Sequence, residues 1–482
     1  MITAKFGGTS VADAAAIGRL SAIVAGNAAV KVVVVSALAG ITDALLACVG
    51  HAGRGDAGAA AAGFGAVRLR HLGLMDDLAT GPGTRAQVES ELDRLGALLA
   101  ALAAVSALGA KDTVTPAQQD AVVATGELLS SRIVADALVS RGIPAIWIDA
   151  RKAVVTDQQF TRAAPLEAET AASLQRVVAP AIREGRIAVV GGFVGATAEG
   201  VTTTLGRGGS DYSAALIGAL LGADEIHIWT DVDGMLTADP RVVPTVRLVP
   251  HLSFAEASEL AYFGAKVLHP STIQPAVARN IPVRILNARR PGGPGTLITA
   301  SAPSASGALR AIASKRDVTV IDITSTRMLM AHGFLRRVFE VFDRHGAAVD
   351  VVTTSEVSLS VTIDDASALD AIVADLGAFA DVSYERGLGL VCAVGERLRT
   401  DPTLFTRILE ALDGLPLRLV SQAGSRQNVT FVVAQRDLAP AMERLHRRFF
   451  EGAGTAGAGP AAPHEALAAP EASAVAREES AA

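Results

Sequence analysis

The 482-residue chain has few cysteines, few aromatic side chains and no strong excess of either charge. Its two cysteines, Cys48 and Cys392, are far apart in apolar surroundings, so we expect no disulfide framework and a reducing cytoplasm suits the chain. The formal net charge is −6 and no long lysine or arginine run is present, which argues against nucleic acid as the main partner.

Long hydrophobic runs are also missing. The longest uncharged apolar run lies between Arg94 and Lys111 and is shorter than the roughly 20 residues that a membrane-spanning helix needs. The opening residues MITAKFGG lack the basic and apolar regions of a signal peptide. We therefore expect a cytoplasmic chain with no membrane partner.

Several enzyme motifs are missing too. The chain has no G-x-x-x-x-G-K-[ST], no H-E-x-x-H and no paired C-x-x-C, so neither P-loop chemistry nor a dedicated protein metal site is expected. One G-x-G-x-x-G occurs, at residues 452–457, but no strand precedes it and we attribute it to the glycine-rich composition there.

The most informative stretch is Thr203–Asp239, which reads as a glycine turn, a helix and a strand. The glycines of Gly206–Gly209 let the backbone approach a ligand closely, and Ser210 is a candidate helix cap. The helix start offers free N–H groups and partial positive charge to an anion. Arg207 adds a planar cation suited to a carboxylate or phosphate. The loop TDVDG follows the strand, where ligands of open α/β sheets bind.

A second anion-binding turn is predicted at the N-terminus. The strand at residues 2–6 carries Lys5 near its end and runs into Gly7–Gly8, and a helix follows with a capping-box-like start at Ser10 and Asp13. Two such turns, with the cations Lys5, Arg207 and Lys266, suit phosphoryl transfer from a nucleotide. Each cation alone has an ordinary explanation as a surface or turn residue, but their shared placement beside glycines does not.

The strand–helix alternation predicts the fold. Strands are expected at residues 31–35, 145–149, 187–195, 225–229 and 282–286, and residues 51–120 look helical with a break near Gly81. This pattern predicts an α/β domain at residues 1–299, with a mostly parallel sheet between helices. Residues 308–385 and 386–451 read as two ferredoxin-like βαββαβ units, and the strand at 308–314 fits either unit. The Ala/Gly/Pro-rich tail 452–482 is expected to be disordered.

Longer motifs add a resemblance to the aspartokinase family. They are KFGGTSV at 5–11, SALAGITD at 36–43, GELLS at 126–130, TTTLGRGGSDYSAAL at 202–216, WTDVDG at 229–234 and FGAKVLHP at 263–270. Residues 333–364 resemble the regulatory ACT domain of the lysine-sensitive, monofunctional class. The resemblance implies an amino-acid-kinase fold with two ACT domains, and ATP-dependent phosphorylation of the L-aspartate side chain to 4-phospho-L-aspartate, the first step of lysine, threonine and methionine biosynthesis.

The resemblance also implies roles for individual residues. Lys5 and Asp211 are the catalytic residues. The substrate-binding residues are Ser36, Thr42, Glu127 and Arg207, with Arg207 on the α-carboxylate and Glu127 on the α-ammonium. The ATP-binding residues, for ATP carrying Mg²⁺, are Lys5, Phe6, Gly7, Gly8, Thr230, Asp231, Leu236, Arg241, Lys266 and Val267. Leu236 stands where related kinases often have tyrosine, which leaves the nucleotide contact there open.

The regulatory residues implied by the resemblance form a site for L-lysine as inhibitor, in a homo-oligomer joined through the ACT domains. They are Met328, Gly333, Phe334, Leu335, Val349, Asp350, Ser355 and Glu356. Lysine or threonine as the effector, and a dimer or a tetramer, stay open. Two alternatives remain for the whole chain, a kinase of another amino acid such as glutamate and a catalytically silent amino-acid sensor.

Overall fold

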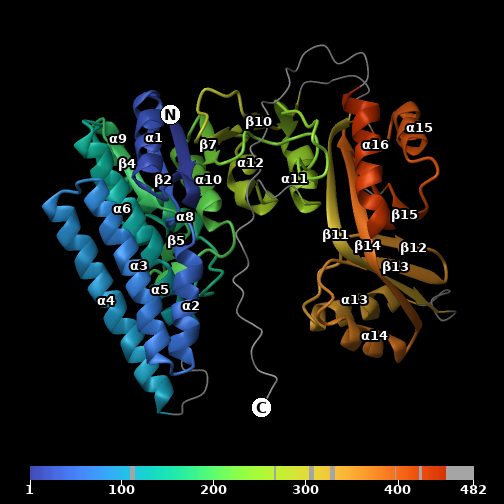
Figure 1. Cartoon of the computed structure of the whole chain (residues 1–482), viewed down its shortest axis with the longest axis horizontal. Helices are drawn as coiled ribbons and strands as arrows, with labels where there is room; N and C mark the ends of the chain where they lie inside the picture. Colours follow the sequence, from blue (N-terminus) through green and yellow to red (C-terminus); the bar gives the residue numbers. More distant parts are fainter. Residues whose placement is uncertain are drawn as a thin grey trace, which may run out of the picture.

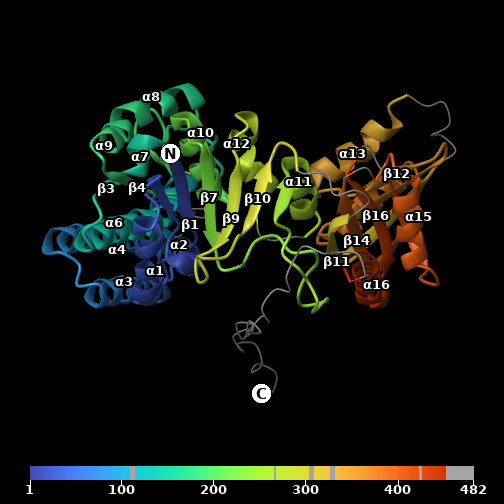
Figure 2. The same cartoon turned by 90° about the horizontal axis from the view of Figure 1, so that it is seen from above.

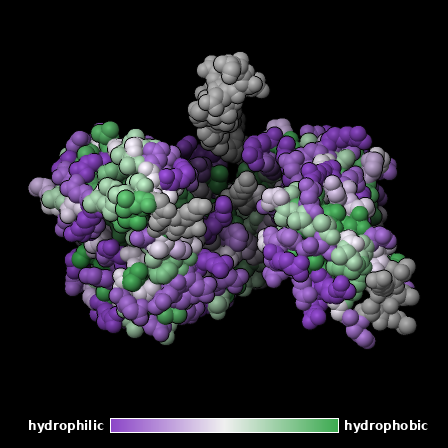
Figure 3. All heavy atoms as spheres, turned by 90° about the horizontal axis from the view of Figure 1, so that it is seen from below, coloured by the Kyte–Doolittle hydropathy of each residue, from purple (hydrophilic) through white to green (hydrophobic). Residues whose placement is uncertain are grey.

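The computed structural model describes residues 1–108, 114–264, 268–302, 309–325, 332–396, 398–422 and 426–451. Figure 1 shows two lobes side by side, an N-terminal lobe that ends at residue 302 and a C-terminal lobe that begins at residue 309. The predicted tail at residues 452–482 lies outside the described residues. No helix among the described residues is long and apolar enough to cross a membrane. Hydrophilic side chains cover most of both lobes in Figure 3, with apolar patches scattered between them.

The N-terminal lobe is built on an eight-stranded sheet with the order β3-β4-β2-β1-β7-β9-β10-β8. The six strands from β3 to β9 are parallel, whereas β10 runs antiparallel to β9 and parallel to β8. The strands are β1 (Ile2–Phe6), β2 (Val30–Val35), β3 (Ala145–Ile148), β4 (Ile187–Gly191), β7 (Glu225–Thr230), β8 (His251–Ser253), β9 (Val283–Asn287) and β10 (Thr296–Thr299). The predicted mostly parallel sheet is confirmed, and β8 and β10 are strands that the sequence did not reveal.

Helices cover both faces of this sheet (Figure 2). Strand β2 shows why, because Val33 and Val35 are buried in one apolar cluster while Val32 and Val34 are buried in another on the opposite face. The helices are α1 (Ala14–Ala25), α2 (Ile41–Gly53), α3 (Ala57–Asp77), α4 (Pro82–Ala107), α5 (Pro116–Val123), α6 (Thr125–Ser140), α7 (Ala150–Ala153), α8 (Glu167–Val177), α9 (Ala179–Arg183), α10 (Gly209–Leu221), α11 (Phe254–Tyr262) and α12 (Gln274–Ala278). The helical reading of residues 51–120 and its break near Gly81 are therefore confirmed.

The predicted strand at 187–195 is wrong in one respect. The chain turns at Phe193, whose φ is 65°, and residues 194–196 form β5 (Val194–Ala196), which pairs with β6 (Thr202–Thr204) in a separate small sheet. The cause is the approach of α10, because a Cβ at Gly192 would lie 2.7 Å from the Ser210 Cβ. The turn lets the start of α10 reach the end of β4.

The C-terminal lobe is one six-stranded antiparallel sheet with the order β12-β13-β11-β14-β16-β15. Helices α13 and α14 lie together beside one half of the lobe and α15 and α16 beside the other (Figure 1). The strands are β11 (Leu309–Thr324), β12 (Val352–Thr354), β13 (Ser358–Ile363), β14 (Asp381–Gly395), β15 (Leu417–Ser421) and β16 (Asn428–Ala434), and the helices are α13 (Phe334–Arg344), α14 (Leu369–Gly377), α15 (Pro402–Ala411) and α16 (Leu438–Phe450). Helix α14 is the second helix that the predicted βαββαβ order of the first unit requires.

Strands β11 and β14 are long because each serves both units. Residues 318–324 of β11 pair with 381–388 of β14 and with β13, whereas residues 309–315 pair with 390–395, which also pair with β16. The strand that fitted either unit therefore lies with the second. Asp317, with a φ of 57°, interrupts the register between the two halves. The boundary at 385 that the sequence suggests falls inside β14.

We expect Gly192→Ala to lower both the thermal stability and the activity, since its methyl group would push the start of α10 away from β4. Overpacking of this kind costs about 1–3 kcal/mol. Gly65→Ala is the control, because a Cβ at this helical position meets nothing within 4 Å, and alanine in a helix is favourable by about 1 kcal/mol over glycine. Thermal unfolding and steady-state kinetics of both variants test this, and equal stabilities would contradict the close approach.

Candidate active site

One pocket of about 550 Å³ opens at the carboxyl ends of β1, β2 and β4. It brings together side chains that are up to 206 residues apart in the sequence, from the end of β1 to the first turn of α10. Six of the predicted site residues line it, namely Lys5, Ser36, Thr42, Glu127, Arg207 and Asp211, together with the predicted glycine Gly8. The sequence motifs therefore converge on one cavity.

The floor of the pocket holds an ion pair between Lys5 and Asp211. The Lys5 Nζ lies 2.6 Å from Asp211 Oδ1, and the two side chains are 12% and 16% exposed. Asp211 lies in the first turn of α10, whose N-terminal end faces the same pocket. The pair fixes the ammonium group at the end of β1 while leaving it open to a further anion.

The start of α10 differs from the prediction. The N-cap is Gly208 with a φ of 73°, so Ser210 lies inside the first turn and caps nothing. Glycine suits this position twice over, because of its positive φ and because a Cβ there would lie 2.6 Å from the Thr272 Cγ2. Arg207 precedes the cap, is exposed and lines the pocket. Its guanidinium can therefore reach a ligand at the helix start.

Glu127 is buried in α6 at the opposite side of the pocket. Its side chain is among the buried charged groups at 3% exposure, and Oε2 has no hydrogen-bond partner among the described residues. Burial raises the pKa of Glu127 to about 8, against the opposing effects of the Ala37 amide and of Lys5. Helix α6 approaches closely because Gly126 has no side chain, and a Cβ there would lie 2.9 Å from the Ala37 Cβ. The site thus holds a buried carboxyl group that a cation would ionise.

Asp120 is a site residue that the sequence reasoning missed. It lines the pocket from α5, is 1% exposed, and accepts hydrogen bonds from Thr204 Oγ1 at 2.7 Å, Thr204 N at 3.0 Å and Thr161 N at 2.8 Å. These bonds hold β6 and the loop that precedes α8 against α5, so Asp120 shapes the pocket wall. Its only sequence signal is an acidic residue directly before the apolar run Ala121–Ala124.

The predicted ATP-binding residues are less concentrated. Thr230 and Asp231 follow each other at the end of β7, beside β1. Phe6 is fully buried and stacks on Trp229 with ring centroids 5.9 Å apart, and the Gly7 amide donates to the Trp229 carbonyl at 3.2 Å. The Gly7 amide is therefore already hydrogen-bonded within the protein. This corrects the expectation that the amides of Gly7 and Gly8 are both available to bind phosphate. Gly8 is the glycine that lines the pocket.

The other predicted ATP-binding residues are not among the described residues that line the pocket. Leu236 packs against an apolar cluster that includes Phe431 and Leu445 of the C-terminal lobe, so its side chain is taken up by the joint between the lobes. Arg241 is 81% exposed and pairs with Asp239 at 2.7 Å. Lys266 and Val267 lie outside the described residues.

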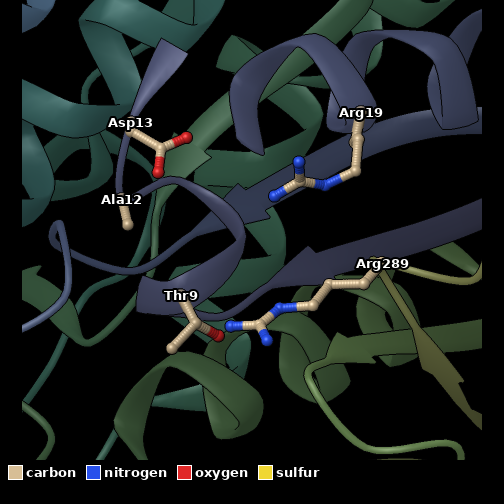
Figure 4. A pocket seen from close by; sticks show the side chains of 5 residues that line it. All are labelled: Thr9, Ala12, Asp13, Arg19 and Arg289. Atoms are coloured by element: carbon tan, nitrogen blue, oxygen red, sulfur yellow. The ribbon is translucent and has the colours of Figure 1, made fainter. Parts of the chain in front are cut away.

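A second pocket, of about 340 Å³, lies beside the first glycine turn and is lined by Thr9, Ala12, Asp13, Arg19 and Arg289. Figure 4 shows the guanidinium groups of Arg19 and Arg289 pointing into it from α1 and from the end of β9. The Asp13 carboxylate instead caps α1 by accepting from the Ala16 amide at 2.7 Å, so the helix begins at Ala14. Two arginines beside this turn give the rim a positive potential that favours an anionic nucleotide.

The predicted effector residues lie in the first unit of the C-terminal lobe. Gly333 is the N-cap of α13 with a φ of 82°, Phe334 is buried, Leu335 is exposed, and Met328 lies outside the described residues. Val349, Asp350, Ser355 and Glu356 flank β12. Asp350 is buried and bonded within the chain, whereas Glu356 is exposed. The two acidic residues therefore differ in environment.

Comparison with known proteins defines the class first. Residues 1–287 match the amino acid kinase family and residues 391–449 match an ACT domain. The chain belongs to the amino acid kinase family, and the expected fold class is confirmed.

Similar proteins define the particular kinase. The chain is 36% identical over 462 residues to lysine-sensitive aspartokinase 3 of Escherichia coli, covering 94% of this chain and 99% of the relative. It is 36% identical over 466 residues to chloroplastic aspartokinase 3 of Arabidopsis thaliana, covering 93% of this chain and 81% of the relative. The crystal structure of E. coli aspartokinase III with aspartate and ADP matches with a TM-score of 0.79 at 36% identity, over 93% of this chain and 100% of that one. Within its family the chain is therefore an aspartokinase, an enzyme that phosphorylates aspartate.

We expect Glu127→Gln to stabilise the protein relative to wild type, increasingly so from pH 5 to pH 8. The folded pKa of Glu127 is raised to about 8, so between its unfolded value and pH 8 the folded chain keeps a proton that the unfolded chain has lost. Wild-type stability therefore falls as pH rises through this window, by about 5 kcal/mol at most. The glutamine side chain does not ionise in this range, so the variant lacks this loss of stability.

The measurement is the difference in melting temperature between variant and wild type across the pH range. Glu169→Gln on α8 is the matched control, because Glu169 is exposed, and its difference should not change with pH. A pH-independent effect of Glu127→Gln would mean that Glu127 is ionised in the free enzyme.

Proposed function

We propose that the pocket at Lys5, Glu127, Arg207 and Asp211 binds L-aspartate by its two ends and directs its side-chain carboxylate to the γ-phosphate of ATP. The observation that carries this is the set of charged groups in one cavity, where Lys5, Arg207 and the start of α10 lie with Glu127, whose Oε2 has no hydrogen-bond partner among the described residues. Arg207 takes the α-carboxylate in a forked contact, and Glu127 gives up its proton to take the α-ammonium. Ser36 and Thr42 are hydrogen-bonding neighbours.

The chemistry needs charge neutralisation more than proton transfer. The attacking carboxylate has a free pKa of about 4, so it is ionised at neutral pH and needs no general base. A carboxylate oxygen forms a bond to the γ-phosphorus while the bond from that phosphorus to the bridging oxygen breaks, and ADP leaves. Lys5 and the start of α10 offset the repulsion between the two anions. Asp211 orients Lys5 for this task, since it holds the ammonium group at 2.6 Å.

The nucleotide is proposed to lie along the ends of β1 and β7. Gly8, Thr230 and Asp231 line its path, and Lys266 and Val267 are assigned to it on the resemblance alone. Magnesium is proposed to arrive on the phosphates of ATP. Because the described residues contain no group of three or more His, Cys, Asp or Glu placed to hold a metal ion, phosphate oxygens and water would supply most of its ligands.

The C-terminal lobe is proposed to bind L-lysine as a feedback inhibitor at Gly333, Phe334, Leu335, Val349, Asp350, Ser355 and Glu356, with Met328. The relative from E. coli is named as lysine-sensitive, and a structure of that enzyme contains lysine and aspartate with a TM-score of 0.79 to this chain over 93% of its length. A homo-oligomer is proposed to form through this lobe. Exposed apolar side chains support this, including Leu335, Phe339, Val352 and Val357.

We expect Arg207→Ala to raise the KM for aspartate roughly 10- to 100-fold, because a hydrogen bond to a charged group contributes about 1.5–3 kcal/mol. The KM for ATP should change little, and Arg207→Lys should recover part of the loss. Release of ADP measured at varied aspartate tests this. Arg186→Ala is the control, since Arg186 is half-buried just before β4, at the end of that strand away from the pocket, and pairs with Glu184. An unchanged KM in Arg207→Ala would remove Arg207 from the substrate site.

We expect millimolar L-lysine to suppress ADP release by the wild-type enzyme, and Glu356→Gln to weaken this suppression without changing activity in the absence of lysine. Glu356 is exposed and can hold a ligand's ammonium group without first breaking a contact. L-threonine is the comparison effector. Inhibition by threonine alone would keep the kinase assignment and overturn lysine as the effector.

A further inference from the structure

Helix α11 connects the two lobes through one face. Its residues at positions 256, 259 and 262 are three apart, and each contacts the C-terminal lobe. Glu256 pairs with Arg310 at 3.1 Å, Glu259 accepts a hydrogen bond from Asn428, and the Tyr262 hydroxyl donates to the Val349 carbonyl at 3.4 Å. The capping box of Ser253 and Glu256 joins the start of the helix to β8 of the large sheet. The helix is therefore built into both lobes.

The three contacts are not equivalent. Glu256 and Glu259 contact the half of the C-terminal sheet that belongs to the second unit, since Arg310 lies in the first part of β11 and Asn428 in β16. Tyr262 alone of the three contacts the first unit, and it does so at Val349 and Asp350. Those are two of the proposed effector residues. Burial and the Asp350 carboxylate raise the pKa of Tyr262 to about 12, so its hydroxyl remains a donor at neutral pH.

The Asp350 carboxylate already forms an ion pair with a lysine of the same chain. The Lys315 Nζ lies 2.7 Å from Asp350 Oδ1 and 2.9 Å from Asp364 Oδ2, and 4.8 Å from the centre of the Tyr262 ring. Asp350 is 3% exposed and Asp364 is 43% exposed. One ammonium group thus faces two carboxylates and one aromatic ring, and the cluster of Lys315, Asp350 and Asp364 has a net charge of −1. A second cation would be attracted to it.

The backbone confirms how tightly this corner is assembled. Gly264 follows α11 with a φ of 119°, and a Cβ there would lie 2.3 Å from the Ser314 carbonyl oxygen. Ser314 directly precedes Lys315 in β11, so the chain just beyond α11 lies against the residue before Lys315. A shift of Lys315 is therefore felt at the end of α11.

We propose that Lys315 is the internal competitor for the ammonium group of the effector at Asp350, and that Tyr262 is the positioning residue through which the effector site acts on α11. This rests on the proposed regulation by lysine and deepens it. An effector ammonium that binds Asp350 displaces Lys315 from the carboxylate and from the Tyr262 ring. The apparent affinity for the effector is then the intrinsic affinity reduced by the competition with Lys315.

If Lys315 competes with the effector, removing Lys315 and removing Asp364 should change the affinity for L-lysine in opposite directions. Lys315→Met removes the competitor and leaves two carboxylates for the effector, so L-lysine should bind at least several-fold more tightly. Asp364→Asn removes a carboxylate and leaves Lys315 fully committed to Asp350, so L-lysine should bind several-fold more weakly. Asp364 is the gentler site, since it is exposed. Lys315→Arg restores the charge and should resemble wild type. Calorimetric titration of the full-length enzyme with L-lysine measures all three.

If Tyr262 acts only by positioning α11, its substitution should change the inhibition by L-lysine but not the binding of L-lysine. Tyr262→Ala should bind L-lysine about as tightly as wild type, yet lose most of the inhibition of ADP release at saturating lysine. Tyr262→Phe keeps the ring and should lose less. Glu259→Ala is the matched control, because it breaks a contact on the same face of α11 that does not reach the effector residues, and it should keep both binding and inhibition.

The outcomes distinguish this inference from the regulatory proposal beneath it. A wild-type enzyme that neither binds L-lysine nor is inhibited by it overturns both. Wild-type binding and inhibition, with Lys315→Met and Asp364→Asn unchanged in affinity, overturn the competition alone. Full inhibition in Tyr262→Ala, or an equal loss in Glu259→Ala, overturns the role of Tyr262. If Lys315→Met does not fold, Asp364→Asn and Lys315→Arg still decide the competition.

Discussion

The ion pair between Lys5 and Asp211 is the contact on which the site depends. It joins the end of a central strand to the first turn of α10, two elements that are separated by more than 200 residues. For the pair to form, α10 must start at the end of β4, and this requires Gly192 and Gly208 to lack side chains, the chain to turn at Phe193, and β5 to leave the sheet. These local irregularities of the N-terminal lobe therefore have one shared result. They place the start of α10 beside the Lys5 ammonium group.

Glu127 complements this arrangement with the opposite charge. A buried carboxyl group whose pKa is raised to about 8 is costly to ionise, and the cost is offset only when a cation arrives. Such a group favours ligands that carry an ammonium group over simple dicarboxylates, because only the former neutralise it. Together with the cations Lys5 and Arg207, which line the same pocket, this group supports the proposed binding of an amino acid that carries a second carboxylate.

The sequence predicted those features that depend on local pattern. Glycine turns, helix periodicity and apolar strands located Lys5 and Arg207, and the resemblance assigned roles to Asp211 and Glu127. It did not reveal features that depend on contacts between distant segments. Asp120 looks like an ordinary helix residue until Thr161 and Thr204 are placed against it, and the Gly7 amide looks free until β7 brings Trp229 beside it. Ser210 failed as a cap because α10 already begins at Gly209, after Gly208, where a positive φ and the approach of Thr272 favour glycine. Strand β11 could not be divided correctly since a single strand serves both units.

The sharing of β11 and β14 between the two units bears on how a small ligand can act at a distance. The second unit holds α11 at Glu256 and Glu259 whether or not an effector is present, so this part of the helix serves as a pivot. The first unit reaches only the Tyr262 end, about 9 Å along the helix from Glu256 at 1.5 Å per residue. In the proposed regulation, a ligand that alters the first unit therefore acts on α11 at its Tyr262 end. Because coupling is reciprocal, nucleotide or aspartate bound in the N-terminal lobe must, in the proposed regulation, weaken effector binding by the same factor by which the effector weakens their binding.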